Sequence, residues 1–238
     1  MSNGREDLLR RVPLFEDLRT DQLAELMGRA TRQTARKGGV LIAEGDADPN
    51  FLVFLTSGRA NVIVAGPRAR EVIVGVIDAP DIVGEIGMLD GSPRSATVKA
   101  DTPLEYLRIG AKAFLDVMRN DGAFSVKVAR HVASTLRRTN EQLRVISTME
   151  AKHRVVWCLS ILARQRGKPH AAGLVLEQNP LHRDIGDMTG LSRETATRAL
   201  RELARERCIT QQHDGLIVNV KGINRYLDQW PWLSNPRL

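Results

Sequence analysis

The chain has 238 residues, of which 42% are hydrophobic and 26% are charged, and its formal net charge is +7. These values are typical of one large or two ordinary globular domains, and they exclude a disordered chain. No apolar run reaches the about 18 residues of a membrane span, and the amino-terminal MSNGREDLLRRVPLF is charged where a secretory signal would be apolar. We therefore expect a soluble cytoplasmic protein with no membrane partner.

The positive charge is concentrated toward the carboxyl end. Residues 151–238 contain 14 Lys and Arg against 8 Asp and Glu, a balance of +6, whereas residues 1–150 contain 21 against 20. A solvated surface could have this composition, but a phosphate backbone as partner would require such a local excess.

The first half of the chain changes from helical to strand patterns. Residues 6–30 space their leucines as short helices do, around a proline. From about residue 38 to 109, Gly, Asp and Pro separate short β-rich runs, which are VLIA, FLVFLTSG, ANVIVA, EVIVGVI, ATVKA and LEYLRI. This alternation predicts a compact antiparallel β-barrel or roll.

A long helix is predicted next, because residues 123–153 contain neither Gly nor Pro. A helix of about 30 residues spans roughly 45 Å, which suits a dimer spine between two domains better than a small core. A single helix packed on its own barrel is the alternative. Spacings of three and four residues, as in a coiled-coil seam, relate Ala129, Val132, Leu136, Thr139, Leu143 and Ile146.

The remaining sequence predicts short helices over about 154–232, ending in a hairpin, CITQQHDGLIVNV, that turns near Asp214 and Gly215. The expected fold class is α+β. We expect an amino-terminal antiparallel β-roll with helices over 1–122, a dimerisation helix and hinge over 123–153, and a winged helix-turn-helix domain over 154–238.

The stretch LHRDIGDMTGLSRETATRALREL has the pattern of a helix-turn-helix. Gly190 provides the turn, Leu191 fills the angle between the helices, and Ser192 stands where the second helix needs an N-cap. The residues expected to face DNA are Arg183, Ser192, Arg193, Glu194, Thr197, Arg198 and Arg201.

Arg and Glu are side chains that read base edges well. Arg can donate two parallel hydrogen bonds to guanine, and Glu can accept one from cytosine, whereas Thr197 and Arg201 are expected on phosphates. Charged helical hairpins also occur in proteins that never touch DNA. In a homodimer the two helices would enter major grooves about 34 Å apart, so the expected partner is palindromic double-stranded DNA.

The segment GEIGMLDGSPRSATV, residues 84–98, contains Glu85 and Arg94. One polar ligand would satisfy both, since Arg presents a planar fork to phosphate and a carboxylate accepts hydrogen bonds from a sugar hydroxyl. The alternative is an internal Glu85–Arg94 salt bridge that braces a loop. The spacing favours neither interpretation.

Metal chemistry and catalysis have little support in the sequence. Cys158 and Cys208 lack paired spacing, and the five histidines form no i, i+4 pair. A hydrolase of nucleotide phosphate would need an activated nucleophile or a metal, but residues 84–98 contain no His or Cys and only Asp90 as a spare carboxylate. We expect no enzymatic activity.

Several motifs together resemble one known family. GEIGMLDGSPRSATV resembles the phosphate-binding cassette of cyclic-nucleotide-binding domains, and SRETATRAL resembles the recognition helix of the same regulators. VPLF near the start, EGD at 44–46 and FLVFLTSGRANVIV also match, so that the similarity covers about residues 8–222. The chain resembles the Crp/Fnr-type transcription regulators, closest to their cyclic-AMP-responsive branch.

The resemblance implies a ligand site and its partners. Gly84 and Glu85, followed by Ile86, would hold the ribose hydroxyl, and Arg94 with Ser95 would hold the cyclic phosphate of cAMP. Thr139 and Asn140 would face the base, although Asn140 departs from the Ser of the family pattern. The implied protein is a homodimeric allosteric regulator that contacts RNA polymerase.

Alternatives remain for the ligand. Cyclic GMP is possible because Ser95 could bond guanine, and cyclic di-GMP or ligand-independent activity would keep the DNA-binding role. Both cysteines follow residue 157 and no histidine precedes His131, which argues against the iron–sulfur and haem sensors of the family.

Overall fold

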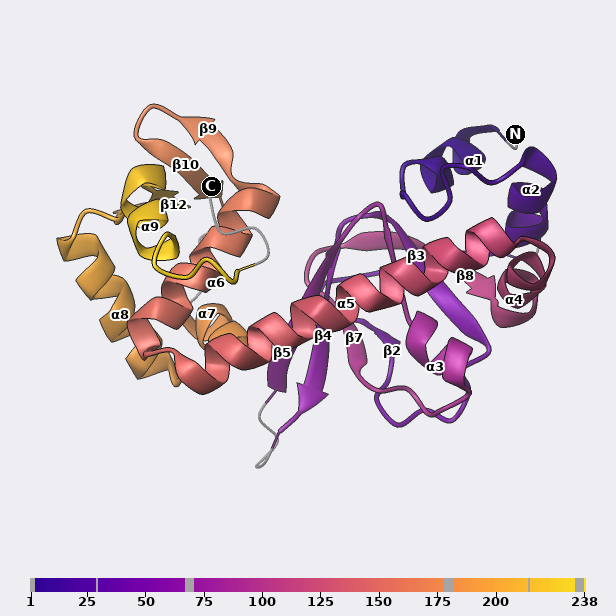
Figure 1. Ribbon diagram of the computed structural model, residues 1–238, viewed down its shortest axis with the longest axis horizontal. Helices are drawn as coiled ribbons and strands as arrows, with labels where there is room; N and C mark the ends of the chain where they lie inside the picture. Colours follow the sequence, from indigo (N-terminus) through magenta and orange to yellow (C-terminus); the bar gives the residue numbers. More distant parts are fainter. Residues whose placement is uncertain (1–2, 29, 67–70, 178–181, 214, 234–237) are drawn as a thin grey trace. The chain divides into compact units, whose positions relative to one another are not determined.

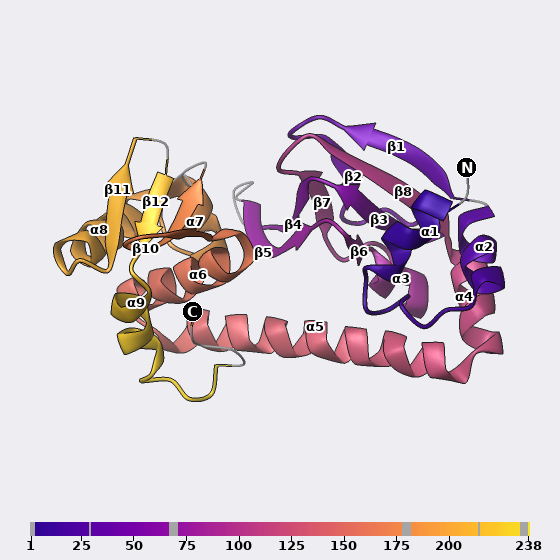
Figure 2. The ribbon, with the colours of Figure 1, turned by 90° about the horizontal axis from the view of Figure 1, so that it is seen from above.

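The computed structural model describes residues 3–28, 30–66, 71–177, 182–213, 215–233 and 238, with the backbone alone at 3–6 and 182–184. The chain divides into two compact units, Met1–Leu136 and Arg137–Leu238. Figures 1 and 2 show the elements of both units.

Two four-stranded antiparallel sheets form the amino-terminal unit, in the strand orders β1-β8-β3-β6 and β2-β7-β4-β5. Six of these strands coincide with the predicted β-rich runs, while the polar β1 and the very short β6 were not predicted. The strands are β1 (Thr31–Ala35), β2 (Val40–Ile42), β3 (Phe51–Ser57), β4 (Arg59–Ala65), β5 (Glu71–Asp78), β6 (Asp81–Val83), β7 (Thr97–Ala100) and β8 (Leu104–Gly110).

Strand β3 is buried on both faces, which explains its unbroken apolar sequence. Phe51, Val53 and Leu55 point into the space between the two sheets, where they join residues of β2, β7 and β8. Leu52 and Phe54 point the other way, toward a cluster made with the helices. The space between the sheets is called the roll interior below.

Helices close one end of the roll, as both views show (Figures 1 and 2). Phe15 of the VPLF motif lies at their centre, with its ring edge-on to Phe54 and Phe114 and stacked on Phe124. The helices of this unit are α1 (Asn3–Arg10), α2 (Thr20–Gly28), α3 (Glu85–Asp90) and α4 (Ala111–Asn120).

Helix α5 (Gly122–Thr148) contributes residues to both units. It ends five residues earlier than the expected 123–153 segment, since Glu150 is extended and caps the next helix, α6 (Ala151–Arg166). The break contains no Gly or Pro and so has no compositional signal. It is stabilised by Arg154 of α6, whose Nε donates a 2.8 Å hydrogen bond to the carbonyl of Met149.

The carboxy-terminal unit is a helix-turn-helix with a four-stranded antiparallel sheet of order β11-β12-β10-β9. The expected hairpin is confirmed as β11 and β12, in which Gln212 pairs with Gly215. Strands β9 and β10 were not predicted. The elements after α6 are β9 (Lys168–His170), β10 (Gly173–Glu177), α7 (His182–Thr189), α8 (Arg193–Arg205), β11 (Ile209–Gln212), β12 (Gly215–Val218) and α9 (Val220–Leu227).

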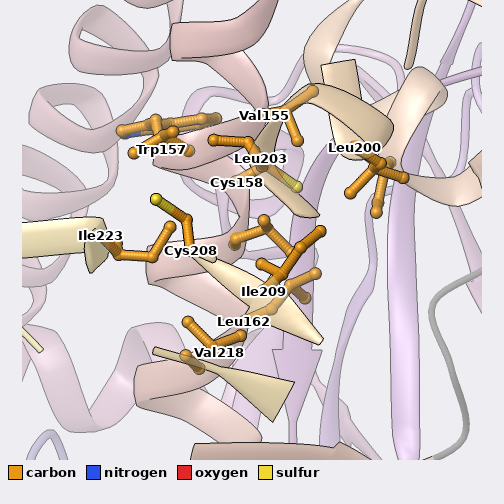
Figure 3. Close-up of a cluster of buried hydrophobic side chains, with 14 of the residues drawn as sticks. Val155, Trp157, Cys158, Leu162, Leu200, Leu203, Cys208, Ile209, Val218 and Ile223 are labelled. Carbon is orange, nitrogen blue, oxygen red and sulfur yellow. The ribbon is translucent and has the colours of Figure 1, made fainter. Parts of the chain in front are cut away.

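One hydrophobic core holds this unit together. Figure 3 shows side chains of α6, α8, β11, β12 and α9 converging on it, among them Val155, Leu203, Ile209 and Ile223. The two cysteines belong to this core as free, buried thiols. Burial raises the pKa of Cys208, so it is a packing residue and not a reactive one.

The expected α+β architecture of a β-roll, a long helix and a helix-turn-helix with a β-wing is confirmed. None of the described helices is both long enough and apolar enough to span a membrane. Within the described residues, no group of three or more His, Cys, Asp or Glu side chains is arranged to hold a metal ion.

Candidate functional site

The segment 84–98 runs from the end of β6 through α3 and a short loop into β7. Gly84 ends β6 with a φ of 91°, and α3 begins at the next residue. A Cβ on Gly84 would lie 2.6 Å from Cδ1 of Ile42 and 3.3 Å from Nη1 of Arg94. The left-handed backbone conformation therefore favours glycine at this position, and a Cβ would also require Ile42 to shift.

Arg94 is buried, with 3% of its surface exposed. Its Nη1 donates a 2.7 Å hydrogen bond to the carbonyl of Gly84, and its Nη2 donates a 2.6 Å bond to the carbonyl of Phe51. Its Nε is buried with no hydrogen-bond partner. Arg94 forms no ion pair with the described residues, and its direct hydrogen-bond partners are backbone carbonyls.

Burial lowers the pKa of Arg94, while the carboxylates of Asp46 and Asp48 act in the opposite direction. The segment that carries these aspartates is fastened to Arg94 by its backbone. The N–H of Gly45 donates to the carbonyl of Arg94 at 2.8 Å, and the N–H of Arg94 donates to the carbonyl of Asp46 at 2.9 Å. These bonds fasten the EGD segment to the cassette.

Glu85 does not pair with Arg94, so the interpretation of the segment as an internal salt bridge is wrong for the described structure. Its carboxylate is also buried, with 5% of the residue exposed. Oε1 lies 3.7 Å from Nε2 of His131 on α5. The two cassette side chains are therefore both buried and are not paired with each other.

The other predicted ligand residues are more accessible. Ser95 is exposed beside Arg94, and Ile86 has 42% of its surface exposed. Thr139 and Asn140 are exposed residues of α5 and belong to the carboxy-terminal unit, whereas the cassette belongs to the amino-terminal unit. The structure thus brings together Gly84, Glu85, Arg94 and Ser95 but assigns Thr139 and Asn140 to the other unit.

The helix-turn-helix is built as its sequence predicts. Gly190 has a φ of 69° in the turn, and Leu191 donates its N–H to the carbonyl of Gly186 at 2.9 Å. Ser192 is the N-cap of α8, since its Oγ accepts a 3.2 Å hydrogen bond from the N–H of Thr195. Helix α8 buries one face in the core through Ala196, Ala199, Leu200 and Leu203.

The opposite face of α8 is basic and exposed. Arg193, Arg198 and Arg201 are exposed, and their guanidinium groups form no ion pair or hydrogen bond within the described part of the chain. Glu194 is also exposed, and its pKa is lowered by hydrogen bonds from its own backbone N–H and from the Ser192 hydroxyl. These side chains are free to contact an external partner.

Two predicted DNA contacts differ from the others. Thr197 is half-buried, and its hydroxyl donates a 2.7 Å hydrogen bond to the carbonyl of Arg193, one turn back along α8. It is therefore less outward-facing than predicted, because a Thr hydroxyl in a helix can bond the preceding turn. The side chain of Arg183, in α7, lies outside the described residues.

Sequence reasoning missed three residues around the cassette. His131 approaches Glu85 from 46 positions away, and no sequence signal connects them. Phe51 lies under the guanidinium of Arg94, with its ring centroid 4.5 Å from Cζ, and Arg108 approaches the same ring at 3.6 Å. Arg108 did have a signal, since it occupies the face of LEYLRI that Leu104 and Tyr106 make apolar.

Each of the two units contains a segment that matches a known family of domains. A model of the cyclic nucleotide-binding domain matches residues 32–121, and a model of the Crp-like helix-turn-helix domain matches residues 153–226. The chain belongs to the Crp/Fnr family of transcription regulators. It is a DNA-binding regulator with a cyclic nucleotide-binding domain, and members of this family are regulators and not enzymes.

Relatives within the Crp/Fnr family are distant. The CRP-like cAMP-activated global transcriptional regulator of Mycobacterium tuberculosis is 22% identical over 214 residues, covering 90% of this chain and 95% of the relative. The cAMP-activated global transcriptional regulator CRP of Salmonella typhimurium is 26% identical, covering 75% of this chain and 84% of the relative.

Solved structures of the family share the fold. The c-di-GMP responsive global regulator CLP of Xanthomonas campestris superposes with a TM-score of 0.72 at 17% identity, covering 84% of this chain and 99% of that one. At this identity the likeness establishes the architecture alone. The ligand has to be argued from the side chains in the roll.

Proposed function

We propose that this Crp-family chain is a homodimeric regulator that binds DNA in response to a cyclic mononucleotide, with cyclic AMP as its ligand. The observation that carries the proposal is Arg94, an arginine with 3% of its surface exposed, a buried Nε without a partner and no ion pair among the described residues. A buried charge without a counter-charge costs stability, and an anionic ligand would offset that cost.

The other cassette residues fit a nucleotide. Gly84 leaves no room for a side chain beside the guanidinium, and Glu85 is a carboxylate that can accept a hydrogen bond from a ribose hydroxyl. Ser95 is exposed next to Arg94 and has a hydroxyl for the phosphate. A cyclic phosphodiester with an attached ribose satisfies all of these groups.

Cyclic AMP is preferred because the distant relatives that cover most of the chain are named as cAMP-activated. Cyclic GMP is the first alternative, since Ser95 could also bond guanine, and Asn140 departs from the family pattern at the base. Cyclic di-GMP is the second, in view of the similar fold of a regulator that responds to it. Activity without any ligand is the third.

The exposed leucines of helix α5 support the proposal of a homodimer. Leu136 and Leu143 lie on the predicted seam, with 59% and 62% of their surfaces exposed in the single chain. A second copy of α5 would cover them, since apolar residues repeating every 3.5 positions favour helix pairing. Leu136→Glu should then convert the dimer to monomers in sedimentation velocity, whereas the exposed Ser134→Glu, off the seam, should not. A dimer unchanged by Leu136→Glu would contradict this seam.

Thr139, the polar member of the seam, is the position where a ligand could act on both subunits. If the ligand contacts the roll and the seam helices in only one arrangement of the dimer, binding shifts the population toward that arrangement. A shift from about 1:99 to 99:1 needs roughly 5.5 kcal/mol of differential affinity. Two charged phosphate sites together with base contacts can supply this.

The exposed face of α8 is the proposed reader of DNA. Arg193 and Glu194 would contact base edges, and Arg198 and Arg201 would hold the duplex, together with Arg183 and the amino-terminal end of α8 at Ser192. With two copies the operator is a palindrome, for which a TGTGA-type half-site is our first choice. Activation would proceed through RNA polymerase, in the cytoplasm.

The test is binding to a fluorescent palindromic TGTGA-type duplex at fixed salt, without ligand and with cyclic AMP, cyclic GMP or cyclic di-GMP. Tight binding only with cyclic AMP supports the proposal, and tight binding only with another nucleotide replaces the ligand. Equal binding in all four conditions would refute ligand control and leave the DNA-binding role.

A further inference from the structure

Arg108 is a charged residue on the inner face of a strand. Along β8, Leu104 and Tyr106 belong to the apolar cluster of the roll interior, whereas Leu107 and Ile109 belong to the cluster under the helices. Side chains alternate along a strand, so Arg108 shares the inward face with Leu104 and Tyr106. It is half-buried there, opposite Val53 of β3.

Arg108 and Arg94 share one aromatic ring. The Cζ atoms of the two guanidinium groups lie 3.6 Å and 4.5 Å from the ring centroid of Phe51, so they are no more than about 8 Å apart. Their proximity also appears in the titration of Arg94, because the charge of Arg108 lowers the pKa of Arg94. The ring face attracts each cation but cannot neutralise both.

No carboxylate neutralises this pair. Arg108, like Arg94, forms no ion pair among the described residues. The carboxylates that act on Arg94, Asp46 and Asp48, are exposed, and each accepts a hydrogen bond from a backbone N–H of its own loop. Two like charges beside one aromatic ring are stabilised best by an anion that binds between them.

The two arginines differ in what they have left to donate. Arg94 uses Nη1 and Nη2 on the backbone carbonyls of Gly84 and Phe51, and it is almost wholly buried. The guanidinium of Arg108 donates no hydrogen bond within the described residues, and it is more accessible. An anion that approaches the two guanidinium groups would therefore find the free donors on Arg108.

We infer that Arg108 is a second anion-binding residue of the nucleotide site, and that it binds the phosphodiester of the ligand together with Arg94. The inference rests on the proposed function, because it assigns a role within that site. The affinity for charged nucleotides would then depend on two arginines that both contact the ring of Phe51. Arg108 comes from β8, and Arg94 comes from the cassette.

The experiment measures cyclic AMP binding to the full-length protein by isothermal titration calorimetry. The variants are Arg108→Gln, Arg108→Lys and Arg94→Gln. Arg32→Gln is the control, since it removes the same charge from an exposed position on the neighbouring strand β1. Adenosine serves as the uncharged ligand, and thermal unfolding of each variant reports on folding.

Arg108→Gln should weaken cyclic AMP binding about 10- to 100-fold, as expected for lost hydrogen bonds to a charged group, and should leave adenosine binding unchanged. It should also reduce the salt dependence of cyclic AMP binding. Arg108→Lys should recover part of the affinity because it keeps the charge. Arg32→Gln should bind as the wild type does.

Wild-type affinity in both Arg108 variants, with binding lost in Arg94→Gln, would overturn the role of Arg108 and leave the proposed function standing. Equal losses for cyclic AMP and adenosine would show that Arg108 only shapes the roll, and would also overturn it. If Arg108→Gln unfolds, Arg108→Lys decides: partial loss of cyclic AMP affinity with adenosine binding unchanged supports the role of Arg108, whereas wild-type affinity for cyclic AMP overturns it. Failure of the wild type to bind any of the three cyclic nucleotides would overturn the proposed function, and the inference with it.

Discussion

The two units of this regulator hold their arginines in opposite ways. On α8, Arg193, Arg198 and Arg201 are exposed in water, where an unpaired charge costs little and can meet a long polyanion directly. In the roll, Arg94 is buried and Arg108 is half-buried beside it, where an unpaired charge is costly. Under the proposed function, arginine would serve two kinds of phosphate recognition that differ in the burial of the side chain.

The largest effect is expected when the buried charge of Arg94 is removed. Arg94→Ala should abolish the response to cyclic nucleotide, with at least about a 100-fold loss of ligand affinity, because charge-assisted bonds in a buried site have no substitute. Non-specific DNA binding should persist, since α8 is unaltered. Fluorescence anisotropy on a specific and on a random duplex, with and without cyclic AMP, measures both.

Arg36→Ala is the matched control, because it removes an exposed arginine from the same unit. It should leave the ligand response intact. If Arg94→Ala responds to ligand as the wild type does, the cassette is a structural loop, and the contrast between the two units disappears.

On the exposed side, Arg193→Ala should cost about 1–3 kcal/mol at a single G·C pair and relax specificity there. Arg201→Ala should instead weaken binding to all sequences and reduce the salt slope by about one. A duplex panel with each position substituted, measured at two salt concentrations, separates these outcomes. Uniform weakening by Arg193→Ala would reassign that residue to the phosphate backbone.

Ser192 is expected to matter for stability more than for contact. Its hydroxyl caps α8, so Ser192→Ala should lower the free energy of unfolding by about 0.5–2 kcal/mol, whereas Ser192→Asp should keep the cap. Urea denaturation followed by circular dichroism measures the difference. Equal stability of the Ser and Ala forms would mean that the hydrogen bond to Thr195 adds nothing to α8.

The sequence predicted the features that local rules determine. The turn Gly190, the cap Ser192 and the outward arginines of α8 were found because local helix rules set their positions. Six strands of the roll were found from their β-rich composition. The cassette was found as a contiguous motif.

The missed features depend on contacts distant in sequence. Strand β1, TRQTA, is a strand because it pairs with β8 and not because of its own residues. His131 meets Glu85 only through the packing of α5, and the end of α5 at Thr148 depends on Arg154 from the next helix. Thr197 was expected to point outward, but its hydroxyl donates to the carbonyl of Arg193 on its own helix.

Two glutamates, one in each unit, also differ in burial, and the pKa of the exposed one is the smallest effect that we predict. Glu85 is buried beside His131, whereas Glu194 is exposed, with its pKa lowered first by its own backbone N–H and then by the Ser192 hydroxyl. A lowered pKa in the folded state means that this stabilisation is present above the unfolded pKa and is lost as the pH falls through the folded value. Glu194 should therefore remain a charged acceptor for cytosine in mildly acidic solution.

An NMR titration of the Glu194 side-chain carboxyl should give a pKa below the ordinary value for Glu. Ser192→Ala should move that pKa upward without reaching the ordinary value, because the hydrogen bond from the backbone N–H remains. An unshifted pKa in the wild type would mean that the amino-terminal end of α8 does not hold this carboxylate, and that Glu194 reaches DNA from a freely moving side chain.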